Sequence, residues 1–196
     1  MRCAQLGSDL TYGPLAFAAA DALLERFLEQ CRAFSERIVL QSDAYLARMG
    51  PIIFEAAQGL LLDQGEAGFP FVSRSSTGLT NITAIAIEAE IGELEAVYVT
   101  RCYLTRHGRG GMEDERSIDH WFSVNDATNL PNPWQENLRF GLLDPARLGR
   151  RIAADLAVAG DTMAVTPSLV ITCLDQARDD RLGWIDGAEV RSGPVR

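Results

Sequence analysis

The stretch ITAIAIEAEI-GE-LEAVYVTRCYLTR, residues 82–106, decides the predicted fold, because two runs of alternating apolar and polar residues flank Gly92-Glu93. Glycine followed by a second residue between two such runs is typical of a two-residue type II′ hairpin turn. In this register Ile91 would pair with Leu94. We therefore expect an antiparallel hairpin with one apolar face turned toward a core.

The same register places two acidic residues opposite each other beside the turn. Glu90 would face Glu95 across the hairpin, and like charges in that position destabilise an antiparallel pair. Water, an arginine-bearing partner or a cation would have to offset this repulsion. We expect water to offset it, with an arginine-bearing partner as the next explanation. A cation comes last, because the sequence has no calcium-loop spacing. Both glutamates are therefore candidate interaction residues.

Helices are expected before this hairpin. Pro14 is a typical first helical residue, and apolar residues then recur with a period near 3.6 up to Ile38. Pro51 is expected to begin another helical stretch that is apolar almost all round, which argues for burial. We therefore predict a helical hairpin or triplet in residues 1–65 and an α+β sheet region in residues 66–196, together forming one compact domain.

The remaining segments predict one more helix and three more strands. Asp144 is a suitable N-cap for a helix that begins at Pro145. The strands are expected at Ser117–Val124, Thr162–Leu174 and Leu182–Val190. The order of elements predicts an α+β fold, in which the N-terminal helices pack on a mostly antiparallel β-sheet that carries one further helix.

Composition excludes several functions. All 18 residues counted as lysine or arginine are arginine, which excludes a phosphate-loop lysine, a kinase lysine and a Schiff-base lysine. The net charge of −9 disfavours nucleic-acid binding. No apolar run is long enough to cross a membrane, and the polar N-terminus is unlike a signal peptide. We expect a cytoplasmic or other intracellular protein without a nucleic-acid partner.

The four cysteines show no CxxC pairing. Cys31 lies on the apolar stripe of the first predicted helix, and Cys102 and Cys173 lie inside strand-like runs. Cysteines in such positions are typically reduced and behave as small apolar residues, which indicates a reducing compartment. Cys3, near the N-terminus, has no lipidation motif around it, and its role stays open.

Both histidines flank the loop that follows the predicted hairpin. His107 and His120, with Glu113 or Asp114 between them, could meet at one metal ion. However, two histidines cannot form a three-histidine site, and the spacing matches no zinc signature. We therefore expect no cofactor and no catalytic residue here, and a metal site at these four residues stays open. Instead, loop 107–116 is predicted to be a polar hairpin tip that contacts a partner.

Arginine and tryptophan side chains supply further candidates for contacts with other chains. Residues 1–100 contain 6 arginines and 13 acidic residues, whereas residues 101–196 contain 12 arginines and 14 acidic residues. The acidic first half of one copy could therefore pair with the arginine-richer second half of another. The candidates are Arg109 in loop 107–116, Trp134 in the loop 125–137, and Arg150 and Arg151 on the second predicted helix.

These observations favour a non-enzymatic function, since no nucleophile elbow or dinucleotide-binding glycine motif is present. We expect an assembly or interaction subunit of a larger complex, such as a virion or an injection machine. It would bind other protein chains, or further copies of itself, through loops 107–116 and 125–137. Two alternatives stay open. One is a small acidic chaperone or peptide-binding module, and the other is a small metal-dependent or acid–base enzyme centred on His107 and His120.

Overall fold

The structure is a computed structural model, and it describes residues 14–65, 68–126, 128–133 and 136–195. The chain has two compact units, Met1–Ser42 and Asp43–Arg196, and each is described by itself. Within the described residues, no helix is both long and apolar enough to cross a membrane.

The first unit consists of one long helix, α2 (Pro14–Ser35), as its 3.6-residue period predicted. Its C-terminal end is closed locally, because the Ser35 hydroxyl donates hydrogen bonds to the carbonyl oxygens of Cys31 and Arg32, each at 2.9 Å. Of the predicted helical hairpin or triplet, the described residues up to 65 beyond this helix supply only the short 3₁₀ turns Asp43–Arg48 and Leu60–Leu62. Residues 52–59 form no helix, and β-branched Ile53 is 92% exposed. An apolar helix is stable only where its sides are covered.

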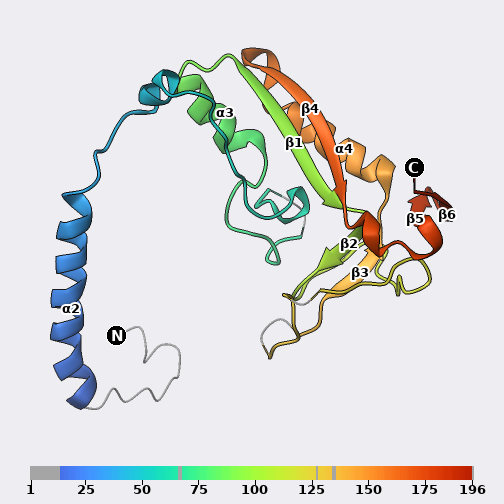
Figure 1. The fold of residues 1–196 in the computed structure, drawn as a ribbon, viewed down its shortest axis with the longest axis horizontal. Coiled ribbons are helices and arrows are strands. Elements are labelled where there is room, and N and C mark those ends of the chain that lie inside the picture. The colour runs from blue at the N-terminus through green and yellow to red at the C-terminus, as the bar shows by residue number, and fades with distance from the viewer. Residues whose placement is uncertain (1–13, 66–67, 127, 134–135, 196) are drawn as a thin grey trace. The chain divides into compact units, whose positions relative to one another are not determined.

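In its described residues, the second unit contains two α-helices and six strands (Figure 1). The helices are α3 (Leu79–Glu88) and α4 (Pro145–Leu156). The strands are β1 (Glu93–Arg101), β2 (Tyr103–Arg106), β3 (Arg139–Leu142), β4 (Ala164–Thr172), β5 (Arg181–Asp186) and β6 (Glu189–Pro194). Short 3₁₀ turns are η1 (Asp43–Arg48), η2 (Leu60–Leu62), η3 (Gly160–Thr162), η4 (Leu174–Gln176) and η5 (Arg178–Asp180).

The strands form three two-stranded sheets, which confirms a mixed α+β fold but not a single, mostly antiparallel sheet. β1 pairs with β4 in parallel, from Glu93 beside Ala164 to Arg101 beside Thr172. β2 pairs with β3, and β5 pairs with β6, both antiparallel. The parallel pair requires a crossover, and the chain between β1 and β4 contains α4.

The predicted hairpin of residues 82–106 is wrong, because its first half is helix α3. Leu79, Thr83 and Ala86 are buried along it, a spacing of three and four residues that fits a helix. The isoleucines that alternate in the sequence do not alternate in burial, and Ile87 is 50% exposed. The segment therefore folds by the helical spacing of its buried residues and not by the period-two spacing of its isoleucines.

The predicted facing of Glu90 and Glu95 is wrong for the same reason. Glu90 follows α3 with φ of +58°, whereas Glu95 lies on β1 beside Thr166 of β4. The two carboxylates are not cross-strand neighbours, so no charge repulsion has to be offset there.

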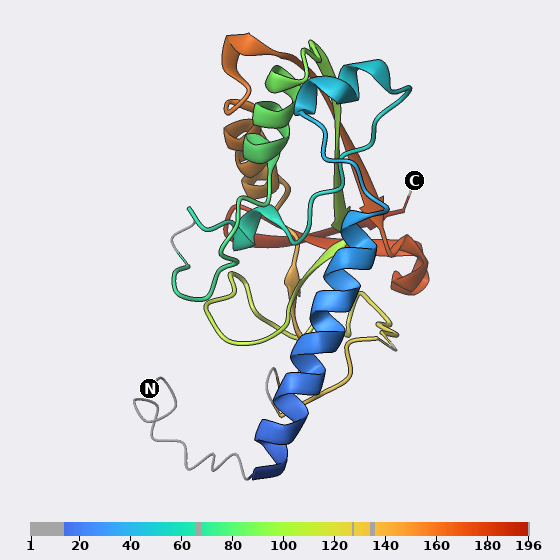
Figure 2. The same cartoon turned by 90° about the vertical axis from the view of Figure 1, so that its left-hand side faces the viewer.

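One carboxylate on α4 joins both helices to the parallel sheet. Asp155 accepts a hydrogen bond from the backbone N–H of Leu79 at 2.9 Å and another from the Tyr98 hydroxyl at 2.8 Å. It thereby caps α3, whose own N-cap residue, Gly78, has no side chain. A Cβ on Gly78 would lie 2.0 Å from the Asp155 carboxylate. The two helices accordingly lie on the same side of β1 and β4 (Figure 2).

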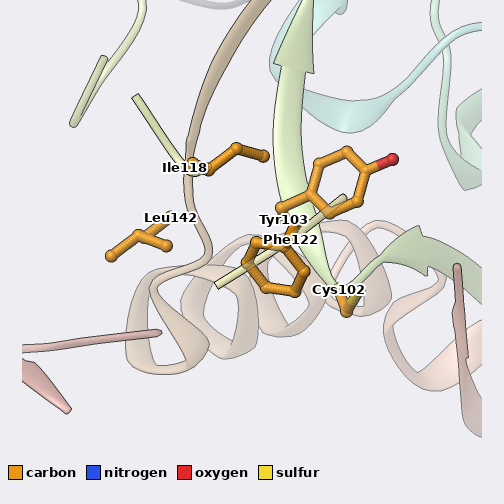
Figure 3. Packing of buried hydrophobic residues seen from close by; sticks show 5 residues of the cluster. All are labelled: Cys102, Tyr103, Ile118, Phe122 and Leu142. Atoms are coloured by element: carbon orange, nitrogen blue, oxygen red, sulfur yellow. The ribbon is translucent and has the colours of Figure 1, made fainter. Parts of the chain in front are cut away.

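A buried hydrophobic cluster of this unit forms where β2 and β3 pack against the side chains of Ile118 and Phe122. Tyr103 and Phe122 pack with ring centroids 5.1 Å apart at 54°. The predicted strand Ser117–Val124 is wrong, because the N–H groups of Trp121 and Phe122 both donate to the carbonyl oxygen of Ile118. This helical turn directs Ile118 and Phe122 into the same cluster. The buried cluster is Cys102, Tyr103, Ile118, Phe122 and Leu142 (Figure 3).

Other predictions were correct or nearly so. α4 begins at Pro145, and the Asp144 side chain accepts from the N–H of Arg147 as the predicted N-cap. The predicted strand Thr162–Leu174 contains β4. By contrast, the single strand predicted at Leu182–Val190 is wrong, because this segment turns at Gly187 and supplies most of β5 and the start of β6, which pair antiparallel.

Candidate functional site

The loop after β2, residues 107–111, is held in place by an arginine from β3. Nη1 of Arg139 donates to the carbonyl oxygens of Gly108 at 3.0 Å and Gly110 at 2.8 Å. Its Nε and Nη2 donate to the two carboxylate oxygens of Glu115 at 2.8 and 2.5 Å. These hydrogen bonds lower the pKa of Glu115 and raise the pKa of Arg139. The planar guanidinium thus joins two parts of the loop at once.

A second arginine fixes the same loop from β2. Arg106 donates from Nε and Nη2 to the carbonyl oxygen of Arg109, at 3.1 and 2.9 Å, and from Nη2 to that of Phe71 at 2.7 Å. Gly110 has φ of +106°, and a Cβ there would lie 2.6 Å from the Cβ of Phe71. Glycine is therefore required at this position both by conformation and by the close approach of residue 71. We call residues 106–111 the glycine loop.

An open pocket of about 470 Å³ lies against the glycine loop. The charge of Arg139 in its wall is balanced by Glu115, and Arg109 is exposed. Among the described residues no side-chain contact is recorded for the Arg109 guanidinium. Glu136 lies in the same wall, so the described lining residues carry two arginines and two glutamates. The lining residues are Gly108, Arg109, Gly110, Glu115, Glu136, Asn137 and Arg139.

A second polar network lies at the other end of β2. The Tyr103 hydroxyl donates to Oε1 of Gln176 at 2.6 Å, and Arg101 pairs with Asp126 at 3.2 Å. Hydrogen bonds from the Thr128 hydroxyl and then from Asn129 hold the pKa of Asp126 well below its usual value. This network ties the loop after residue 125 to β1 and to η4.

Among the described residues, the four side chains considered for a metal site do not form one cluster. Asp114 pairs with Arg116, and Glu113 pairs with Arg147. The His120 ring lies edge-on to Trp121 with centroids 4.9 Å apart, and Nε2 of His107 is buried without a hydrogen-bond partner. In the part of the chain that the structure describes, no three His, Cys, Asp or Glu side chains are grouped so that they could hold a metal ion.

The predicted interaction residues are distributed over several elements of the second unit. Glu90 follows α3, Glu95 lies on β1, and Arg150 and Arg151 lie on α4. Trp134 lies outside the described residues. Loop 107–116 is not a free hairpin tip, because Arg106 and Arg139 fix it. Sequence reasoning missed both arginines, and the only available signal was their position at the ends of two apolar runs.

Comparison with known proteins assigns the chain to a family of enzymes. The family model for adenylosuccinate synthetase matches residues 8–193. The chain therefore belongs to the adenylosuccinate synthetase family.

Curated relatives include the adenylosuccinate synthetases of Francisella tularensis subsp. novicida (strain U112) and of Francisella tularensis subsp. tularensis (strain WY96-3418). Each is 33% identical over 73 residues, which is 37% of this chain and 17% of the relative. The matched segment thus spans about a sixth of the length of these relatives. No solved structure matches the chain significantly.

This membership overturns the expectation of a non-enzymatic assembly subunit, such as a virion or injection-machine component. The expectation rested on the absence of short catalytic motifs. Residues 71, 106–111 and 136–139 come from separate segments that meet only in the fold, so no single short motif covers them. The absence of a motif was therefore no argument against an enzyme.

Proposed function

We propose that the chain acts in the synthesis of adenylosuccinate and that its glycine loop binds an anionic group of that compound. The family match over residues 8–193 carries this proposal. The curated relatives are named for making adenylosuccinate. Because the matched segment is 17% of their length, the proposal concerns the ligand that this chain binds rather than a complete reaction.

The chemistry of the ligand fits the glycine loop. The name adenylosuccinate denotes an adenylate joined to succinate, and so a phosphate and carboxylates. Proteins bind such groups with backbone N–H groups and with arginine, whose planar fork can make two hydrogen bonds to one anion. The chain contains no lysine, so arginine must supply every permanently charged cationic side chain of a binding site.

Within the pocket, Arg109 is the residue that we assign to the anion. Arg139 and Arg106 serve as positioning residues, because their guanidinium groups already bind Glu115 and the backbone of the loop. Arg109 is exposed at the pocket wall, and its neighbours Gly108 and Gly110 both have positive φ. That conformation leaves peptide groups uncovered by side chains, so that a ligand can approach the backbone.

Titration calorimetry tests this assignment, with adenylosuccinate added to the purified chain. We expect binding that weakens by about tenfold in Arg109→Gln, which corresponds to about 1.4 kcal/mol for one lost charge-assisted contact. Arg150→Gln, an equal change of charge at an exposed position of α4, should bind as the unaltered chain does. Absence of binding, or equal affinities in the two variants, would contradict the proposal.

We also propose that a second copy of the chain covers the outer face of the β1–β4 pair. Val97 is 51% exposed there, Val99 65% and Val170 43%, whereas parallel sheets are normally covered on both faces. Light scattering after size exclusion tests this: a dimer that dissociates in Val99→Asp supports it, and a monomer at all concentrations contradicts it.

A further inference from the structure

Two cysteines come together at the carboxyl ends of β1 and β4. The ladder of the parallel pair ends with Arg101 beside Thr172, and the N–H of Cys102 donates to the carbonyl oxygen of Thr172 at 3.0 Å. Cys102 and Cys173 are the next residues along these adjacent strands. Neighbouring strands lie about 4.8 Å apart, and disulfides join Cα atoms about 4.4–6.8 Å apart. The backbone positions therefore suit a disulfide.

The Cys102 side chain also contacts the backbone of Cys173. The Cys102 thiol donates to the carbonyl oxygen of Cys173, with Sγ and O 3.2 Å apart. Cys173 packs against the buried cluster that contains Cys102. The two differ in access: Cys102 is 4% exposed, whereas Cys173 is half-buried. Burial, and then the nearby Cys173, raise the pKa of Cys102 to about 11.

The backbone at Cys173 is unusual for a residue with a side chain. Its φ of 62° and ψ of 26° lie in the left-handed region, at the point where β4 ends and η4 begins. Residues other than glycine and asparagine rarely adopt this conformation, and such positions concentrate at functional sites. Beside it, the Tyr103 hydroxyl holds Gln176 of η4 at 2.6 Å. The cysteine therefore lies at a turn that its neighbours hold in position.

We propose that Cys102 and Cys173 form an oxidisable pair that closes to an intramolecular disulfide when the chain meets hydrogen peroxide. The Cys173 sulfur attacks one peroxide oxygen and breaks the O–O bond, which yields a sulfenic acid and one water molecule. The Cys102 sulfur then attacks the Cys173 sulfur. The S–S bond forms, the S–O bond breaks, and hydroxide leaves with the Cys102 proton as a second water molecule.

The order of attack follows from exposure and protonation. Peroxide reaches the half-buried thiol of Cys173 more easily than the buried thiol of Cys102. Because its pKa is raised, Cys102 stays protonated at neutral pH and is a slow nucleophile toward peroxide. It therefore acts as the resolving cysteine. Disulfides that form and open in a reducing compartment are typically redox-sensing or catalytic rather than structural.

Peptide mapping of the full-length chain tests this pair, in a background in which Cys3 and Cys31 are changed to serine. The chain is treated with hydrogen peroxide, alkylated, digested without reduction and measured by mass spectrometry. We expect one linked peptide that joins Cys102 to Cys173, lighter by two hydrogens and opened by dithiothreitol. Circular dichroism before treatment confirms that each variant is folded.

Single variants separate the two roles. In Cys102→Ser, Cys173 should accumulate as a sulfenic acid that dimedone traps, and in Cys173→Ser, Cys102 should stay alkylatable after peroxide. Both thiols remaining alkylatable in the parent would overturn the proposal, as would a disulfide formed only between chains. Conversion of Cys173 to a sulfinic acid while Cys102 stays reduced would also overturn it. None of these outcomes depends on adenylosuccinate binding, so the two proposals fail or stand separately.

Discussion

Replacing Asp155 with alanine removes the group that joins α3, α4 and β1. The variant leaves the N–H of Leu79 without its cap, which costs about 1 kcal/mol by analogy with N-cap substitutions. It also removes the carboxylate that accepts from the Tyr98 hydroxyl, at about 1.5–3 kcal/mol for a hydrogen bond to a charged group. Asp155 is half-buried, so solvent reduces the second contribution. We therefore expect a loss of about 2–3 kcal/mol in the free energy of unfolding.

Urea unfolding followed by tryptophan fluorescence measures this loss, because all three tryptophans belong to the second unit. With a loss of about 2–3 kcal/mol and a typical dependence of about 1–3 kcal/mol per molar urea, the midpoint should fall by about 0.7–3 M. Asp161→Ala is the matched control, since Asp161 is an exposed aspartate of η3. A midpoint in Asp155→Ala within error of that control would refute the argument that this carboxylate holds the helices on the sheet.

Three further predictions concern alkaline stability, the glycine loop and the core. Burial and Asp155 raise the pKa of Tyr98. The protonated hydroxyl therefore stabilises the folded chain at pH values below about 10, the ordinary tyrosine pKa, and this contribution is lost as the pH rises further. Tyr98→Phe should consequently flatten the decline of the unfolding midpoint at alkaline pH. If the variant and parent decline in parallel, another group is responsible. Gly110→Ala should weaken adenylosuccinate binding by at least tenfold, or about 1.4 kcal/mol, because the new Cβ meets Phe71. Gly111→Ala, with nothing within 4 Å of its Cβ, should leave the affinity unchanged, and equal effects would contradict the close-approach argument. Phe122→Ala should cost about 3–5 kcal/mol in denaturation experiments because its side chain is fully buried, and a loss below about 1 kcal/mol would mean that the cluster is not the core.

Local signals in the sequence predicted the elements that local interactions determine. The helix of Pro14–Ser35 follows from its apolar period, and α4 follows from Asp144 and Pro145, because an N-cap and a first-position proline act within one turn. By contrast, residues 82–91 fit a strand by their isoleucines and a helix by Thr83 and Ala86. The distant Asp155, which caps α3 from α4, favours the helix, and no local signal in residues 82–91 reveals it.

Long-range pairing could not be predicted in the same way. The parallel register that sets Glu93 beside Ala164 joins residues far apart in the sequence, and no turn chemistry specifies it. The candidate site has the same character. Arg139 lies on β3, and Gly108 lies in the loop after β2, so the two residues are distant in the sequence. The pairing of β2 with β3 brings them close enough for the hydrogen bond between them. The loop was recognised in the sequence as a candidate, but its arginine supports were not.

The central claim is that the glycine loop of this family member binds adenylosuccinate. Amide hydrogen exchange followed by mass spectrometry, with and without the compound, tests it most directly because it locates the bound ligand on the chain. We expect slower exchange in residues 106–111 and 136–139, and unchanged exchange in the hairpin of β5 and β6. Protection confined to other segments, or no protection at a saturating concentration, would contradict the claim.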